Sequence, residues 1–393
     1  MQISDVKLAT GSSYLRKASS NNFDREKFMI QNLEYNKAFT EKAKNLSNKE
    51  YDKLLNELKD EYRNYRTSWI GNADMAFSSG KFDKFNPLCL DIETASICDL
   101  ACPHCWREYI LTPDKIMDFD FYKRIIDTAI KLHVPSIKLN WRGEPLLNPK
   151  LEEFISYAKK KGILEVLINT NATTLTEKRA DSLIESGLDQ LIYSFDGGTK
   201  TTYEKMRPAR FKKNKFEDVY KNIKNFNKIK IEKKSLFPIT KIQMVLTKET
   251  RDEIEDYFNL FSDCVDDVSV QPYTERGGNL EGVESDYEII IAKYIEENNL
   301  PKNTNYYVGV NGDIYISVGR KPCRQLFQRL MITFDGRVAM CCQDWGAQHC
   351  LGFIDKDSFN IEKTLQDLEK KIQQNKKGFE LLKNAKRPTK FNE

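Results

Sequence analysis

Histidine is scarce in this sequence: only His104, His133 and His349 occur among 393 residues, which nearly excludes a metal site built from several histidines. The chain has no run of about 20 apolar residues, and its N-terminus has no apolar signal-peptide core. Lys and Arg (62) nearly balance Asp and Glu (58), so the net charge is +4, with both signs scattered along the chain. These absences predict a cytoplasmic protein that binds neither a membrane nor a nucleic acid.

Cysteine, in contrast, is plentiful, with nine residues. Disulfides are rare in the reducing cytosol, so clustered cysteines are better explained as metal or redox ligands. Cys89 and Cys264 stand alone, which is typical of small core residues. The other seven form two clusters, Cys98/Cys102/Cys105 and Cys323/Cys341/Cys342/Cys350.

The hydrophobic pattern divides the chain into four parts. Residues 1–85 predict a polar helical extension, 86–290 an α/β domain, 291–360 a small domain with two β-hairpins, and 361–393 a charged helical tail. Within the α/β domain, predicted strands alternate with helices; the strands are 87–93, 136–140, 165–169, 190–194, 241–246 and 267–273. Such alternation implies parallel pairing, and so an α/β barrel or a wound sheet.

The first cysteine cluster follows the first predicted strand, where α/β barrels place their active sites. Three thiolates match an incomplete metal site. His104 would complete a structural zinc site, but it lies directly beside Cys105, a spacing that rarely lets both side chains reach one tetrahedral ion. A four-iron cluster explains the count better, because three irons take thiolates and the fourth stays open for a substrate or cofactor.

This C-x-x-x-C-x-x-C motif, placed after the first of six strands, resembles the radical S-adenosylmethionine (radical SAM) enzymes over about residues 87–290. The resemblance implies a partial (β/α)6 barrel and a 4Fe-4S cluster whose open iron binds S-adenosyl-L-methionine. In that family an electron from the cluster cleaves this cofactor to a 5′-deoxyadenosyl radical, which abstracts a hydrogen atom from the substrate. An external electron donor such as flavodoxin or ferredoxin is implied as well.

Four later segments are similar to the family's cofactor-binding motifs. "RGEP" at 142–145 resembles Gly-Gly-Glu-Pro, although Arg142 replaces the first glycine, and "TNA" at 170–172 resembles Thr-Asn-Gly. The other two are "YSFDGG" at 193–198 and "TYEKMR" at 202–207. The residues that the resemblance assigns to the cofactor are Gly143, Glu144, Pro145, Asn171, Ser194 and Arg207. Gly143 to Pro145 would hold the methionine amino group, Ser194 the ribose and Arg207 the carboxylate. Each alone is more often an ordinary turn or surface residue.

The second cysteine cluster has the spacing C-x12-G-x4-C at Cys323, Gly336 and Cys341. It resembles the start of the auxiliary-cluster domain called SPASM, or of its shorter relative, twitch. The late C-x-x-C that usually completes the ligand set is missing, so we expect a single auxiliary 4Fe-4S cluster, completed by Cys342 or Cys350. Two alternatives stay open. One iron is left open or bound by Asp344 or His349, or the hairpin carries no metal.

The predicted function is therefore a radical SAM oxidoreductase or isomerase. Its substrate is a small molecule, expected to be a carbohydrate or aminocyclitol that is oxidised or epimerised. The main alternative is a maturase that modifies a ribosomally made peptide, although residues 1–85 show no convincing strand pattern for a peptide-recognition region. An alternative of another class is a non-catalytic iron-sulfur or zinc module that binds a partner, but such a module needs no cofactor motifs.

Overall fold

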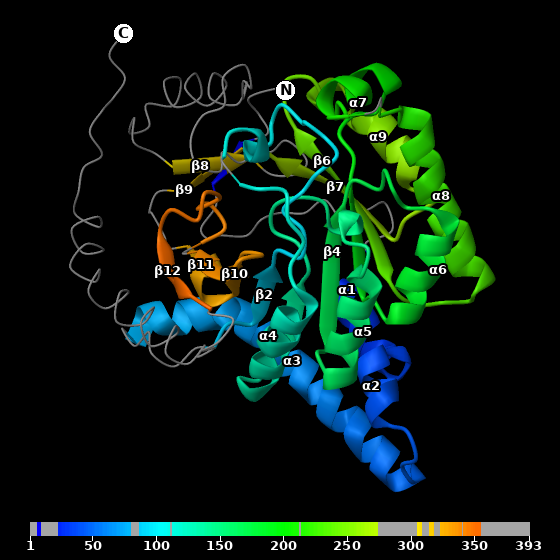
Figure 1. The fold of residues 1–393 in the computed structure, drawn as a ribbon, viewed down its shortest axis with the longest axis vertical. Coiled ribbons are helices and arrows are strands. Elements are labelled where there is room, and N and C mark those ends of the chain that lie inside the picture. Colours follow the sequence, from blue (N-terminus) through cyan, green and yellow to red (C-terminus); the bar gives the residue numbers. More distant parts are fainter. Residues whose placement is uncertain are drawn as a thin grey trace.

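The computed structural model (Figure 1) describes residues 6–8, 23–79, 86–110, 112–211, 214–273, 305–308, 314–317, 323–339 and 341–354. The predicted tail at 361–393 lies outside these residues, as does much of the predicted domain at 291–360. No described helix combines the length and the apolar character needed to cross a membrane.

A nine-stranded sheet forms the centre of the described structure, in the order β12-β11-β10-β2-β3-β4-β5-β6-β7. All six predicted strands are present and pair in parallel with their neighbours. They are β2 (Cys89–Ile92), β3 (Ser136–Lys138), β4 (Glu165–Thr170), β5 (Gln190–Ser194), β6 (Ile239–Leu246) and β7 (Asp267–Pro272). The edge strands β7 and β12 do not pair with each other, so the sheet stays open. This confirms the predicted α/β class with a partial (β/α)6 barrel.

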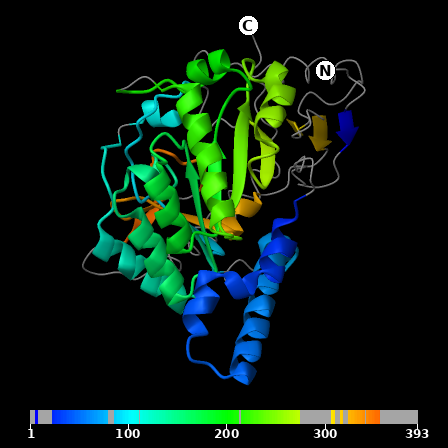
Figure 2. The ribbon, with the colours of Figure 1, turned by 90° about the vertical axis from the view of Figure 1, so that its right-hand side faces the viewer.

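Helices connect these strands and cover one face of the sheet (Figures 1 and 2). They are α4 (Phe119–Lys131), α5 (Leu151–Lys161), α6 (Glu177–Ser186), α7 (Lys200–Met206), α8 (Phe216–Glu232) and α9 (Ile254–Phe261). Short 3-10 helices are η2 (Leu33–Tyr35), η3 (Trp106–Glu108), η4 (Pro145–Leu147), η5 (Arg251–Glu253) and η6 (Arg324–Phe327). The sequence specifies α4 well: Asp118 caps it by accepting a hydrogen bond from the Phe121 amide at 2.8 Å, and Phe121, Ile125 and Ile126 bury one face.

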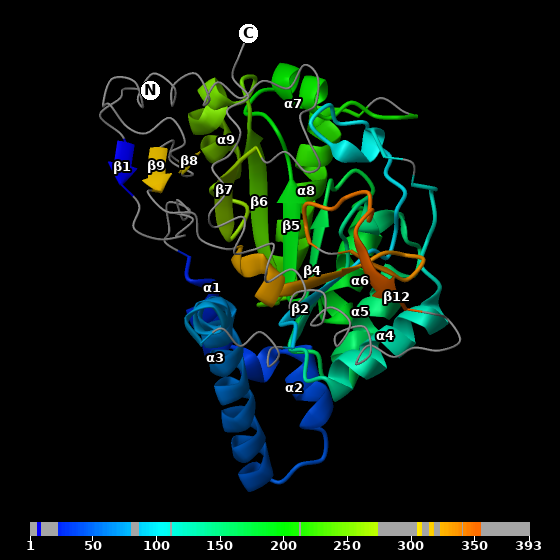
Figure 3. The ribbon, with the colours of Figure 1, turned by 90° about the vertical axis from the view of Figure 1, so that its left-hand side faces the viewer.

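The two faces of the sheet differ in chemistry. Toward the helices the strands contribute apolar residues such as Ile137, Ile168 and Val268 to the main hydrophobic core. The other face, which we call the inner face, carries polar residues on several strands. Paired residues of adjacent strands point to the same side of a sheet, so these polar residues lie next to one another. Ser194, Gln243 and Ser269 are paired across β5, β6 and β7 on this face. Figure 3 looks onto the inner side of the sheet, with the helices behind it.

The predicted helical extension contains α1 (Arg25–Gln31), α2 (Lys37–Lys42) and α3 (Asn48–Ser79), which lie at the N-terminal ends of the strands (Figures 2 and 3). Tyr65 of α3 donates its hydroxyl to Glu165 at 3.1 Å and lies 3.2 Å from the Ser136 hydroxyl, and both of these residues begin strands. Asn36 donates to the Asp189 carboxylate at 2.6 Å, just before β5. The extension therefore closes the end of the barrel opposite the predicted site.

The later strands confirm both predicted hairpins. β8 (Asn305–Val308) pairs antiparallel with β9 (Ile314–Ser317), and β10 (Arg329–Ile332) pairs antiparallel with β11 (Arg337–Ala339). Two pairings were not predicted. β10 joins β2 in parallel, so that β10, β11 and β12 (Cys350–Phe353) extend the barrel sheet. β1 (Val6–Leu8), in the segment expected to be helical, pairs in parallel with β9.

Candidate cofactor and metal site

The three cysteines of the first cluster lie in the loop between β2 and α4, at the carboxyl end of the parallel strands. Cys102 is buried, and Cys98 and Cys105 are half-buried. The Cys105 amide donates to the Cys102 carbonyl at 3.0 Å, which closes a turn between the second and third cysteines. The structure thus places the three thiols in one loop, at the predicted edge of the sheet.

Three neighbouring segments hold this cysteine loop in place. The Glu144 amide, after β3, donates to the Ile97 carbonyl at 2.8 Å. The Asp99 carboxylate accepts hydrogen bonds from Asn171 Nδ2 at 2.8 Å and Thr173 Oγ1 at 2.6 Å, both after β4. The segment after α7 forms a further bridge between Leu100 and Ala209. The loop is therefore braced from the ends of three successive βα units.

Gly143 and Glu144 form the turn that packs against the cysteine loop. Gly143 has φ +72°, and a Cβ there would lie 2.7 Å from the Ile97 carbonyl oxygen and closer still to that of Ala95. Only glycine meets both requirements, the positive φ and the close backbone approach. Pro145 begins η4 directly after Glu144. The Gly-Glu-Pro part of the predicted motif is thus a tight turn in contact with the predicted cluster loop.

The Glu144 carboxylate is buried and holds its surroundings together. It accepts hydrogen bonds from the Leu146 amide (2.9 Å), Thr170 Oγ1 (2.7 Å) and the Asn171 amide (2.7 Å). Burial raises the pKa of Glu144 to about 7, although these hydrogen bonds favour the ionised form. Because a carboxylate has about four acceptor positions, one position is left for an ammonium group.

Arg207 lies at the end of α7 and is buried beside the cysteine loop. Its Nη2 pairs with Asp196 Oδ2 at 2.7 Å, and His104 Nε2 lies 3.2 Å from the same oxygen. Burial alone would raise the pKa of Asp196, but the charges of Arg207 and His104 outweigh it and hold this pKa well below its usual range. Arg207 Nε and His104 Nδ1 are buried and have no hydrogen-bond partner in the protein. The Nε donor points to an acceptor that the protein itself does not supply.

The remaining predicted cofactor residues have different surroundings. Ser194 ends β5 and is half-buried, at the carboxyl edge of the inner face. Asn171 is already engaged: its side chain donates to Asp99 and accepts from the Thr173 amide at 3.0 Å. In this structure Asn171 therefore braces the cysteine loop.

The chemistry of the donor set, three thiols in one loop, fits a 4Fe-4S cluster that keeps one iron open. The thiolates of a 4Fe-4S cluster bind different iron atoms, so they need not converge on one point. Burial raises the pKa of the Cys98 and Cys102 thiols, the latter to about 12, while Arg207 favours the Cys102 thiolate. A cationic metal cluster would supply the charge that stabilises these thiolates.

The second cysteine cluster comes from two segments of the described structure. Cys323 is exposed and precedes η6, whereas Cys341 and Cys342 are half-buried in the loop between β11 and β12, and half-buried Cys350 begins β12. Cys342 and Cys350 pack on the same apolar group as Trp141. The carboxylate of Asp344 is occupied, since it accepts the amides of Gln348 and His349.

The sequence patterns did not indicate Asp99 or Asp196, and they indicated His104 only as a possible zinc ligand. Asp99 stands between two cysteines in the sequence, but its side-chain partners follow β4. Asp196 stands in an Asp-Gly turn after β5, where an aspartate has an ordinary structural explanation. The pairing of Asp196 with both Arg207 and His104 is visible only when three loops are brought together.

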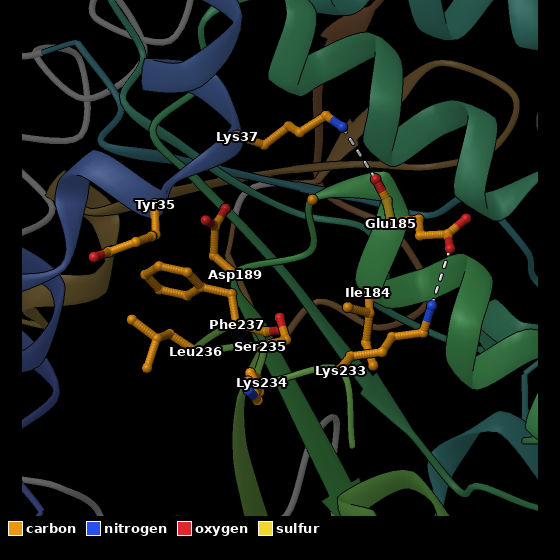
Figure 4. A pocket seen from close by; sticks show the side chains of 11 residues that line it. Tyr35, Lys37, Ile184, Glu185, Asp189, Lys233, Lys234, Ser235, Leu236 and Phe237 are labelled. Carbon is orange, nitrogen blue, oxygen red and sulfur yellow. Dashed lines mark hydrogen bonds and ion pairs between the residues drawn. The ribbon is translucent and has the colours of Figure 1, made fainter. Parts of the chain in front are cut away.

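A pocket of about 690 Å³ lies at the other end of the barrel, near the start of β5 and β6 (Figure 4). Lys37 donates to the Glu185 carbonyl and Lys233 to the Glu185 carboxylate among the residues that line it. It belongs to the junction between the helical extension and the barrel.

Comparisons with known proteins agree with this site. The family model described as "Radical SAM superfamily" matches residues 92–261. The probable GTP 3′,8-cyclase of Pyrococcus horikoshii is 25% identical over 270 residues, which cover 64% of this chain and 82% of that protein. The tungsten-containing aldehyde ferredoxin oxidoreductase cofactor-modifying protein of Pyrococcus furiosus is 32% identical over 110 residues, which cover 27% of this chain and only 30% of that protein.

Solved structures share the fold. The structure described as native anSMEcpe with bound AdoMet aligns with a TM-score of 0.52 and 17% identity, covering 72% of this chain and 82% of that one. Streptococcus suis SuiB bound to precursor peptide SuiA aligns with a TM-score of 0.50 and 16% identity, covering 82% of this chain and 74% of that one. Residues 92–261 therefore match the radical SAM superfamily, whose members use a 4Fe-4S cluster with S-adenosylmethionine, and the three-cysteine loop lies within the matched residues.

Proposed function

We propose that Cys98, Cys102 and Cys105 hold the 4Fe-4S cluster and that the neighbouring motif residues bind S-adenosylmethionine beside it. The observation that most supports this proposal is that one loop bears all three thiols and is hydrogen-bonded to the cofactor motifs themselves. When bound, the cluster and S-adenosylmethionine together supply a 5′-deoxyadenosyl radical, which takes a hydrogen atom from the substrate. The protein's own task is to bind, orient and shield these groups.

Arg207 and Glu144 are suited to the two ends of an amino acid. Arg207 Nε is a buried donor without a partner, and its guanidinium is held in place by Asp196, so it is ready to donate to the methionine carboxylate. Glu144 keeps one acceptor position for the ammonium group, while Gly143 lets the turn approach the cluster loop closely. Ser194, at the end of β5, is assigned to the ribose.

The inner face of the sheet suits a polar substrate without a large net charge. On this face Arg329 Nη1 lies 2.7 Å from Asp91, and Lys241 pairs with Asp267. Nearer the carboxyl edge the face carries amides and hydroxyls, among them Asn169, Ser194, Gln243, Ser269 and Gln271. The Asn169 Oδ1 and Gln271 Nε2 atoms are buried without a partner. These groups would hydrogen-bond a carbohydrate or aminocyclitol, which would be oxidised or epimerised.

Two other substrate classes follow from the relatives. A peptide is the second candidate, because the same amides would bond to a peptide backbone and SuiB is described with a bound precursor peptide. A nucleoside triphosphate, as in the name of the GTP cyclases, needs several free cations. Arg329 and Lys241 are each engaged by an aspartate, which makes this class less suitable for the described face.

For the segment 291–360 we propose one auxiliary 4Fe-4S cluster, with ligands among Cys323, Cys341, Cys342 and Cys350. The half-buried cysteines at 341, 342 and 350 support this assignment, and exposed Cys323 is the remaining candidate ligand. The electron for the first cluster would come from an external donor such as flavodoxin or ferredoxin.

The central test measures cofactor cleavage. The anaerobically reconstituted chain should release 5′-deoxyadenosine when it is incubated with dithionite and S-adenosylmethionine, and Cys102→Ala should abolish this release. Cys264→Ala is the matched control, because Cys264 is buried between α9 and β7, outside both clusters. A Cys102→Ala variant that still cleaves the cofactor, or a purified protein with zinc and no iron, contradicts the proposal.

The substrate class is tested by isotope transfer. Carbon-deuterated myo-inositol and glucosamine are offered as probes, and the mass of 5′-deoxyadenosine is measured. Deuterium in 5′-deoxyadenosine supports a carbohydrate or aminocyclitol substrate. Deuterium transfer only from carbon-deuterated synthetic peptides selects the peptide alternative.

A further inference from the structure

Arg142, which stands where the family motif has a glycine, is the largest fully buried side chain of the described residues. Its Nε and Nη2 atoms form a forked pair with Glu93 at 2.6 and 2.8 Å, and both side chains are completely buried. Its Nη1 donates to the Trp345 carbonyl at 2.7 Å and to Thr112 Oγ1 at 3.1 Å. Arg142 therefore connects Glu93, at the end of β2, to Trp345, in the loop between β11 and β12. Trp345 lies 203 residues after Arg142 in the chain.

The neighbouring residue makes a second connection to the same loop. Trp141 packs in an apolar group with Met331, Ala339 and Ala347, and the half-buried Cys342 and Cys350 pack against this group. The loop 341–350, which we call the C-terminal cysteine loop, therefore rests on the turn that begins at Trp141.

The other half of the turn contacts the first cysteine loop. Glu144 donates its amide to the Ile97 carbonyl, and Gly143 lies against Ala95 and Ile97. Residues 141–145 thus touch both cysteine-bearing loops: Trp141 and Arg142 on one side, Gly143 and Glu144 on the other. A glycine in place of Arg142 would lack the side chain that donates to the Trp345 carbonyl.

We propose that Arg142 is a positioning residue that docks the C-terminal cysteine loop onto the cofactor turn and so fixes the placement of one cysteine site relative to the other. The metal part of this inference rests on the proposed function, whereas the docking itself does not. An Arg–Glu pair that is buried completely is costly to desolvate, and it is better explained by the specific geometry it imposes than by added stability. Its forked hydrogen bonds allow one orientation of the guanidinium, which directs Nη1 to the Trp345 carbonyl.

The chain offers a closely matched control for this pair. Arg329 and Asp91 form another arginine–carboxylate pair, between β10 and β2, in which Asp91 is buried and Arg329 half-buried; Asp91 stands two residues before Glu93. Within the described residues, neither member of this pair hydrogen-bonds to the C-terminal cysteine loop. Replacing both members of a pair by amides avoids an unpaired buried charge, so we compare Arg142→Gln/Glu93→Gln with Arg329→Gln/Asp91→Asn.

The first readout needs no metal. Iodoacetamide is added to the metal-free proteins, and the alkylation rates of Cys342 and Cys350 are followed by mass spectrometry, with buried Cys264 as an internal reference. In Arg142→Gln/Glu93→Gln both rates should rise about tenfold or more relative to Cys264, because the loop loses a hydrogen bond from a charged donor. Unchanged rates, or an equal rise in Arg329→Gln/Asp91→Asn, overturn the docking role.

The second readout tests the link between the two sites. In the reconstituted and reduced proteins, electron paramagnetic resonance detects the magnetic coupling between two clusters, which depends on their separation. The coupling should change in Arg142→Gln/Glu93→Gln and stay as in the wild type in the control pair. Coupling that does not change while alkylation rises overturns the positioning part. Absence of iron in a Cys98/Cys102/Cys105→Ala variant instead rejects the auxiliary cluster of the proposed function, and the alkylation result stands independently of it.

Discussion

Asp99 provides a direct test of the view that the cysteine loop must be braced before it can hold the cofactor. Its carboxylate accepts hydrogen bonds from Asn171 Nδ2 at 2.8 Å and Thr173 Oγ1 at 2.6 Å. Among the described residues, it has no hydrogen bond to any other side chain. Asp99→Ala removes both bonds and leaves Cys98 in place. We predict that this variant folds but binds S-adenosylmethionine weakly.

The magnitude follows from the two bonds. A hydrogen bond to a charged group contributes about 1.5–3 kcal/mol, and solvent screening of the half-buried Asp99 favours the lower end. Two such bonds amount to about 3 kcal/mol, which corresponds to about 100-fold in the equilibrium between braced and released loop. The affinity for S-adenosylmethionine should therefore fall by up to about 100-fold, with a parallel loss of 5′-deoxyadenosine formation.

Equilibrium dialysis of reconstituted protein gives the dissociation constant, and chromatography gives the 5′-deoxyadenosine yield. Asp127→Ala is the matched control, because Asp127 also accepts two hydrogen bonds, from Tyr157 (2.9 Å) and Lys161 (2.7 Å), but on the outer helices. Asp99→Asn keeps two acceptor positions and should lose less than Asp99→Ala. If Asp99→Ala binds and cleaves the cofactor as the wild type does, the bracing argument is refuted.

Two further predictions concern buried ion pairs. Arg207→Lys keeps a cation beside Asp196 but deletes the Nε donor, so S-adenosylmethionine should bind about 10- to 100-fold more weakly in dialysis; an unchanged affinity removes Arg207 from the site. Lys159→Met deprives Asp189 of its partner at 2.7 Å and should cost about 3–5 kcal/mol in urea unfolding at pH 8, while exposed Lys160→Met changes little. Burial raises the pKa of Asp189 to about 6 even beside Lys159, so Asp189 in the folded variant takes up a proton more readily than in the unfolded chain. The free energy of unfolding of Lys159→Met should therefore recover as the pH falls from 8 toward 5. A further loss of stability over this pH range contradicts the reasoning.

The sequence was sufficient to predict the barrel strands and the helices that follow them. Local hydrophobic period and turn residues determine these elements, and the parallel pairing of β2 to β7 follows from the helices between them. The pairing of β10 with β2 was missed, because Arg329 and Cys89 meet across 240 residues and no local pattern records that meeting. The short strand β1, in a segment expected to be helical, was missed for the same reason.

The candidate site divides in a similar way. The cysteine loop and the Gly-Glu-Pro turn were predicted because their motifs are continuous in sequence, and the structure brings the two into contact through Ile97. Side-chain partners across loops were not predictable. Arg207 was expected to face a carboxylate of the cofactor, and the structure adds Asp196 as a second carboxylate that orients it.

The two ends of the barrel explain why the chemistry is confined to one of them. At the N-terminal end, the Glu165 carboxylate accepts the hydroxyls of Tyr62 and Tyr65, so α3 fills the opening between the strand starts. At the carboxyl end, the polar residues of the inner face are followed by loops that are hydrogen-bonded to one another. We therefore expect a substrate to enter from the side that carries the cysteine loops. Arg142 lies buried between Glu93 and the Trp345 carbonyl, so we expect a change at this single position to alter the spacing of the two cysteine sites.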